Sequence, residues 1–185
     1  LTWCMSQTNF THSAIGYQNR DKNGNPTGTL TITELMPEHF VDKDHLTDNA
    51  KYNQYTINEA DILAFQGTED RPANGVIQID ANATQDKTVA DKLANMQANN
   101  KTYDAIDYNC TDYTMSGIKA AGLNVTGKST VFYQTSLPGN LIIPIARTST
   151  PVGLHNSVID RDSQRVSLLR CLPNGYSSQI LLRGK

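Results

Sequence analysis

Cys110 stands at the start of a segment whose pattern predicts a helix. The stretch YDAIDYNCTDYTMSGIKAAGL, residues 103–123, changes at this cysteine from an irregular segment to a helical one. A helix N-terminus carries about half a positive charge and N–H groups without intrahelical partners. Both stabilise a thiolate, and the same N–H groups can bind the oxyanion of a tetrahedral intermediate. The position suits a nucleophile, with Asn109 and Thr111 as neighbours of an oxyanion site.

A nucleophilic cysteine needs a base, which is usually a histidine. The chain has four histidines. His12 lies in THSAIGY, a segment that has the pattern of a half-buried strand. His39 and His45 fall in a turn and in a charged loop, and His155 falls in a predicted helix. His12 is therefore the predicted base.

A carboxylate could orient this base. Asn23-Gly24 predicts the turn of a hairpin between two strand-like segments. The residue numbers of opposite partners would then sum to about 46 or 47, which places His12 across from Glu34 or Leu35. A Glu that accepts the second imidazole N–H holds the ring as the third member of a triad does. The alternative is a charge on an edge strand, which a register shift of one residue would favour.

The other reading of Cys110 is a small buried apolar residue. The chain has three cysteines, so at least one thiol is free or pairs with another chain. Cys4 and Cys171 lie near the two ends, which often come close together in a domain, and could form a disulfide. In that alternative the protein is a non-catalytic binding module. No zinc-type cysteine spacing and no phosphate-binding loop occurs, so we expect no cofactor.

The remaining pattern predicts an α+β protein in which strands at both ends flank a mostly helical middle. Strands are predicted at KYNQYTI and GVIQID, and a hairpin around Pro173-Asn174-Gly175. Helices are predicted at NEADILAFQ, capped by Asn58, at DKTVADKLANMQANN, and from Thr150-Pro151.

Composition limits the classes of partner. The chain has 185 residues and a formal net charge of −2, which suits one domain and gives no electrostatic reason to expect nucleic acid or membrane binding. No apolar run approaches the roughly 20 residues of a membrane span. The chain begins at Leu1, so we expect a processed form or a fragment of a longer protein. The sequence Asn109-Cys110-Thr111 is a glycosylation motif beside the candidate nucleophile, which favours a bacterial source.

Three segments together resemble a known family. They are HSAIG at 12–16, TITE at 31–34 and YDAIDYNCTDY at 103–113. Histidine comes before cysteine, as in the circularly permuted NlpC/P60 group of papain-like cysteine hydrolases. The resemblance covers roughly residues 8–125 and does not extend to the C-terminal segment.

The resemblance implies a single papain-like domain over residues 1–185, in which a small antiparallel sheet packs on the helix that bears the cysteine and the C-terminal part is an accessory extension. It implies a hydrolase of amide or related acyl bonds with Cys110, His12 and Glu34 as catalytic residues. Family members cleave peptide crosslinks of bacterial cell walls, other peptides or lipid acyl groups, and some are effectors of type VI secretion.

For this chain we expect a peptidoglycan amidase that is exported from a bacterium and acts in the periplasm of a target cell, where an immunity protein would be its partner. A protease or deamidase toxin acting on a protein is the alternative, and an acyltransferase acting on lipids is a weaker one.

Overall fold

The computed structural model of the chain describes residues 2–5, 12–39, 41, 45–67, 75–134, 142–161 and 165–170. Its main sheet has seven strands in the order β6-β4-β3-β2-β1-β5-β9, and every neighbouring pair is antiparallel. The strands are β1 (Thr2–Met5), β2 (Ser13–Arg20), β3 (Pro26–Pro37), β4 (Thr47–Asn58), β5 (Gly75–Ile79), β6 (Thr102–Asp104) and β9 (Val166–Arg170).

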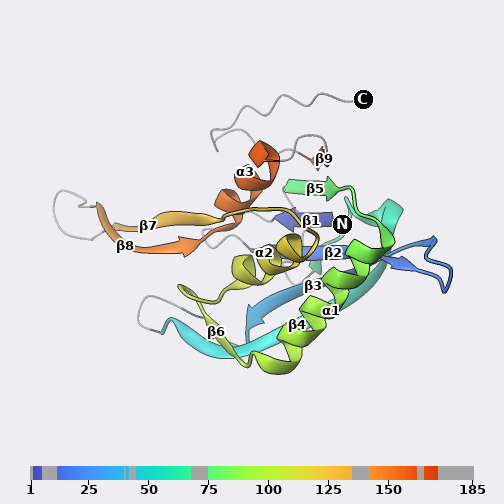
Figure 1. Cartoon of the computed structure of the whole chain (residues 1–185). Coiled ribbons are helices and arrows are strands. Elements are labelled where there is room, and N and C mark those ends of the chain that lie inside the picture. Colours follow the sequence, from blue (N-terminus) through green and yellow to red (C-terminus); the bar gives the residue numbers. More distant parts are fainter. Residues whose placement is uncertain are drawn as a thin grey trace.

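Three helices and a separate hairpin complete the described fold. They are α1 (Ala83–Asn99), α2 (Cys110–Ala120), α3 (Pro151–Arg161) and the pair β7 (Lys128–Gln134) and β8 (Ile142–Ser149). The helices α1 and α2 lie on the same side of the sheet, and the β7–β8 hairpin extends away from it (Figure 1). The α+β class and an antiparallel sheet packed on α2 are confirmed, and so are the strands predicted at KYNQYTI and GVIQID, which form β4 and β5. The sheet is larger than predicted, and β6 was not predicted.

The first sheet face packs against the two helices. Its main cluster joins the inward side chains of the strands to the apolar stripe of α1, formed by Val89, Leu93 and Met96. Gly117 lets α2 approach β2 closely, because a Cβ at this position would lie 2.5 Å from Cδ1 of Ile15. This close approach sets the distance between the start of α2 and the start of β2.

The second sheet face carries a smaller cluster. Ala14, Leu30 and Ile32 meet Ile62, and Phe65 packs against them. The predicted helix at NEADILAFQ is wrong, because only one 3₁₀ turn, η1 (Glu59–Asp61), forms there. After η1 the chain turns, and Ile62 and Phe65 pack on this sheet face.

The β2–β3 hairpin forms at the predicted turn. Gly24 has φ +84°, a conformation that glycine adopts without steric cost. Arg20 lies opposite Pro26, and a bulge between Gln18 and Arg20 then shifts the register.

The bulge changes the predicted pairing of His12. Glu34 lies opposite Ala14 along the strands, so the pairing of His12 with Glu34 or Leu35 is wrong by register. His12 is nevertheless two residues from Ala14 along the chain. Diagonal neighbours on one face of a sheet remain within reach of long side chains.

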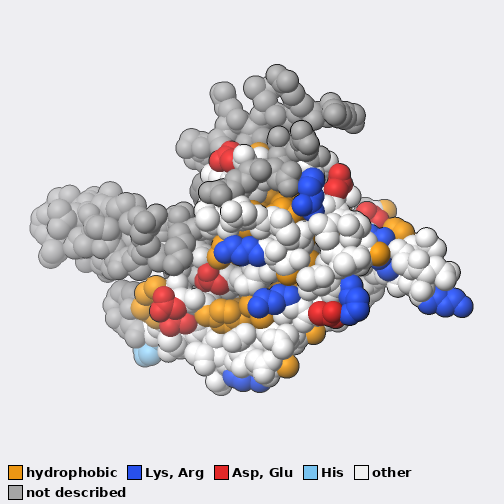
Figure 2. Space-filling model, in the orientation of Figure 1, with side chains coloured by type: hydrophobic (Ala, Val, Ile, Leu, Met, Phe, Trp, Pro, Cys, Tyr) orange, Lys and Arg blue, Asp and Glu red, His pale blue; other side chains and the backbone are white. Residues whose placement is uncertain are grey.

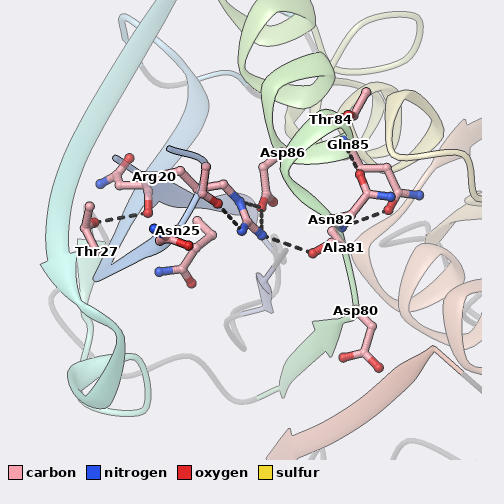
Figure 3. Close-up of polar contacts among 12 residues, drawn as sticks. Arg20, Asn25, Thr27, Asp80, Ala81, Asn82, Thr84, Gln85 and Asp86 are labelled. Atoms are coloured by element: carbon pink, nitrogen blue, oxygen red, sulfur yellow. Dashed lines mark hydrogen bonds and ion pairs between the residues drawn. The ribbon is translucent and has the colours of Figure 1, made fainter. Parts of the chain in front are cut away.

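An ion pair ties this hairpin to α1. The guanidinium of Arg20 lies 2.6 Å from the buried carboxylate of Asp86 and also donates to the backbone carbonyls of Ala81 and Gly24 (Figure 3). A planar guanidinium can satisfy several acceptors at once, so this one side chain holds three segments together.

The chain termini and surface bear on the remaining predictions. The first strand of the predicted C-terminal hairpin is β9, and the turn at 173–175 lies outside the described residues, as does the proposed Cys4–Cys171 disulfide. Within the described ranges no helix is long and apolar enough to cross a membrane. The face seen in Figure 2 carries acidic and basic side chains interspersed over α1 and α2.

Candidate active site

The nucleophile helix begins where the sequence predicts. Asn109 is the N-cap of α2, and its Oδ1 accepts the backbone N–H groups of Thr111 (2.8 Å) and Asp112 (3.3 Å). The carboxylate of Asp112 accepts the N–H of Asn109 in return, which completes a capping box. Cys110 is therefore held in the first turn of the helix.

The same asparagine fastens this turn to β8. Its Nδ2 lies 3.1 Å from each of three acceptors, the Ala105 carbonyl, Thr148 Oγ1 and the Ser149 carbonyl. Ser149 also donates to Asp112 from 2.5 Å. The buried Asn109 amide is thus fully engaged, and its Nδ2 bonds both to β8 and to the Ala105 carbonyl. It is a structural clamp and has no surface position for a glycan.

His12 and Glu34 form a buried pair. Nε2 of His12 lies 2.9 Å from Oε2 of Glu34, whose residue is only 2% exposed. The other carboxylate oxygen accepts the Tyr55 hydroxyl at 2.9 Å and the Asn53 amide at 3.4 Å. These contacts fix the orientation of the carboxylate, which in turn fixes the imidazole ring.

Because Nε2 of His12 is bonded to Glu34, the nitrogen available to Cys110 is Nδ1. Burial opposes the charged imidazolium, but the Cys110 thiolate and the Glu34 carboxylate outweigh it and raise the pKa of His12 to about 10. Burial likewise opposes the thiolate, yet the charge and hydrogen bonding of His12, together with donors of Ser13, lower the pKa of Cys110. The raised pKa of His12 and the lowered pKa of Cys110 both favour a resting thiolate–imidazolium pair.

Tyr103 is a further neighbour of the nucleophile. Burial raises the pKa of its phenol, and so do the charge and hydrogen bonding of Cys110, which keeps the hydroxyl protonated. The backbone N–H of Cys110 also interacts with this hydroxyl. The Tyr103 hydroxyl on β6 is therefore a neighbour of Cys110 at the start of α2.

The structure groups three of the predicted site residues, and the two predicted neighbours of Cys110 belong to the helix cap. His12 is hydrogen-bonded to Glu34, and Cys110 and His12 shift each other's pKa. The three residues are 6% (Cys110), 7% (His12) and 2% (Glu34) exposed. The Thr111 N–H donates to the Asn109 side chain within the capping box, so this N–H group is not available to an oxyanion.

The other histidines lie apart from this group. His39 has an exposed side chain beside Asp48, and His155 is buried in α3.

Three contributors were not predicted from the sequence. Tyr103 stands in the quoted motif without an assigned role, and Ser13 directly follows the base. Tyr55 shares a sheet face with Glu34, because Ile32 lies opposite Tyr55 and two residues before Glu34. An alternation rule applied to the register of β3 with β4 could have found Tyr55.

A metal or cofactor has no evident ligand set here. Among the described residues no group of three His, Cys, Asp or Glu side chains converges as metal ligands.

Comparison of the chain with protein-family models, with curated proteins and with solved structures finds no match. The chemistry of the site must therefore be argued from its own geometry.

Proposed function

We propose that this protein is a cysteine hydrolase that cleaves an amide bond, with Cys110 as nucleophile, His12 as acid and base, and Glu34 as the residue that orients His12. The observation that supports this most is the buried imidazole held between a carboxylate at 2.9 Å and a helix-start thiol. A nucleophile, a base and an orienting group in this relation are what covalent acyl transfer requires.

The acylation step follows from the resting ion pair. The Cys110 thiolate attacks the acyl carbon and forms a C–S bond, and the carbonyl oxygen becomes an oxyanion. We assign the Tyr103 O–H, which lies beside Cys110, as a donor to this oxygen. As the C–N bond breaks, the His12 imidazolium gives its proton to the leaving nitrogen, so an amine departs and a thioester is left.

Deacylation uses the same groups in reverse. Neutral His12 removes a proton from a water molecule, which attacks the thioester carbon. The collapse of the second tetrahedral intermediate breaks the C–S bond and releases a carboxylic acid. Cys110 leaves as a thiolate and again faces an imidazolium.

For the substrate we propose a stem or crosslink peptide of bacterial peptidoglycan. This follows from the resemblance of 12–16, 31–34 and 103–113 to permuted NlpC/P60 hydrolases. The papain-like fold and the role of antibacterial effector, exported to a target periplasm and restrained by an immunity protein, belong to the same proposal.

The test is digestion of purified peptidoglycan sacculi by the wild-type chain and by Cys110→Ala, with the soluble products resolved by mass. Wild-type cleavage at a stem-peptide amide, abolished in Cys110→Ala and in His12→Ala, is the expected result. His39→Ala is the matched control, because its side chain is exposed and lies apart from the site.

Two other results would redirect or end the proposal. Fast alkylation of Cys110 without cleavage of sacculi would keep the cysteine enzyme and move the substrate to a protein or lipid. An inert Cys110 without cleavage would favour the non-catalytic binding module.

A further inference from the structure

Ser13 has a buried hydroxyl that the fold does not otherwise use. It is the first residue of β2 and is 0% exposed. Its Oγ has no hydrogen-bond partner among the residues that the structure describes. Buried polar groups are nearly always hydrogen-bonded, since an enclosed donor without an acceptor is costly, so this one needs an explanation.

The packing of β2 on α2 aims Ser13 at the nucleophile. Ile15 points to Gly117 of α2, and Ser13 lies on the same side of β2 because side chains alternate along a strand. Cys110 precedes Gly117 by about two helical turns and so shares its helix face. Ser13 lies near enough to the Cys110 sulfur for its hydroxyl and backbone N–H to help lower the pKa of Cys110.

We propose that Ser13 is a further catalytic residue, whose enclosed hydroxyl donates to the Cys110 sulfur and stabilises the thiolate. The inference rests on the proposed function, because it matters only if Cys110 is the nucleophile. A thiol is a weak acceptor, and a hydrogen bond to an ionised group is much stronger than one to a neutral group. The hydroxyl therefore gains its full partner when the Cys110 proton moves to His12.

The same donor acts twice in the cycle. It stabilises the thiolate before attack, and it stabilises the thiolate again as this group leaves the thioester during hydrolysis. The backbone N–H of Ser13 assists in the same direction, and no side-chain substitution removes it. A Ser13→Ala variant consequently tests the hydroxyl alone.

The experiment measures the rate of Cys110 alkylation by iodoacetamide against pH. In Ser13→Ala we expect the midpoint to rise by about one pH unit. We also expect the limiting rate at high pH to rise about threefold, because a less stabilised thiolate is a better nucleophile, with a Brønsted slope of about 0.4–0.5. Ser116→Ala is the matched control, since this hydroxyl donates to the Asp112 carbonyl and its loss should leave the midpoint unchanged.

A double-mutant comparison gives a second readout. In the Cys110→Ala background the Ser13 hydroxyl has no sulfur to donate to, so Ser13→Ala should leave Tm unchanged or raise it. In the wild-type background, at a pH where the thiolate is present, Ser13→Ala should lower Tm. Equal effects of Ser13→Ala in both backgrounds would overturn the proposal.

Failure of this proposal is distinguishable from failure of the proposed function, because alkylation needs no substrate. A lowered midpoint in the wild type that Ser13→Ala does not move would reject Ser13 and keep the ion pair. A wild-type midpoint near the ordinary thiol value of about 8.5 would reject both. A midpoint moved by Ser13→Ala, without cleavage of sacculi, would support Ser13 and reject only the substrate.

Discussion

Replacing Glu34 by Gln tests whether the carboxylate charge supports the ion pair. Gln has nearly the same shape, and its oxygen can still accept the His12 N–H. Its amide nitrogen can face the Tyr55 hydroxyl, which accepts as well as donates. The substitution therefore removes charge and leaves the contacts of 2.9 Å to His12 and Tyr55 geometrically possible.

The expected size follows from the burial of the pair. Hydrogen bonds to charged groups contribute about 1.5–3 kcal/mol, and both side chains are almost fully enclosed. One pKa unit corresponds to about 1.4 kcal/mol, so the imidazolium should lose about one to two units of stabilisation. The pKa of His12 falls from about 10 in Glu34→Gln, and the pKa of Cys110 rises because its cationic partner is weakened.

The sign of the pH effect is fixed by these directions. In the wild type the ion pair exists above the lowered pKa of Cys110 and below the His12 pKa of about 10. Activity should rise with pH through the first value and fall through the second. In Glu34→Gln the pKa of Cys110 should rise and the pKa of His12 should fall, so the pH range in which the ion pair exists should become narrower.

The assay is the pH profile of alkylation, followed by hydrolysis of sacculi. The acid limb should move up by about one to two pH units, with a net loss of alkylation rate of about 3- to 10-fold well below the new midpoint. Above the new midpoint the alkylation rate should rise, because a less stabilised thiolate is a better nucleophile. Thermal unfolding of each variant serves as the control for folding. An acid limb identical to that of the wild type, in a folded variant, would refute the coupling between Glu34 and the pair.

Three further variants separate chemistry from scaffold. Tyr103→Phe removes one oxyanion donor, so kcat should fall about 10²- to 10³-fold while Cys110 alkylation stays fast; a kcat close to wild type would contradict this role. Asn109→Ala removes the N-cap and the clamp to β8, so chemical denaturation should show a loss of about 3–5 kcal/mol together with slower alkylation, and a loss below about 1 kcal/mol would contradict the clamp. Arg20→Ala leaves Asp86 buried and unpaired, so unfolding should show a loss of about 3–5 kcal/mol, whereas kcat measured well below Tm should not change.

The elements with strong local signals could be predicted from the sequence. The turn at Asn23-Gly24, the amphipathic helix α1, the start of α2 at Cys110 and the start of α3 at Pro151 all depend on residues close together in the chain. Local capping and periodicity determine such elements, so no knowledge of the remainder of the fold is needed.

Features set by tertiary contact could not be predicted in this way. The segment after Asn58 has helical propensity, yet the demand to cover the second sheet face with Ile62 and Phe65 limits it to one 3₁₀ turn. The bulge near Gln18 is equally invisible, and it moves the partner of Glu34 from His12 to Ala14. The predicted contact was recovered because His12 and Ala14 share a sheet face, so a shift of two residues preserves the side on which the imidazole lies.

The site straddles the sheet, and this arrangement explains why its scaffold is so heavily bonded. Glu34 belongs to the face that Phe65 helps to cover, whereas Cys110 starts the helix on the opposite face. His12 precedes β2 and can reach both Glu34 and Cys110 only while the first turn of α2 is held in place. Asn109 supplies that restraint through three acceptors, so its loss should disturb the chemistry and the fold together. Arg20 restrains the far end of the hairpin, where loss of stability need not move the nucleophile.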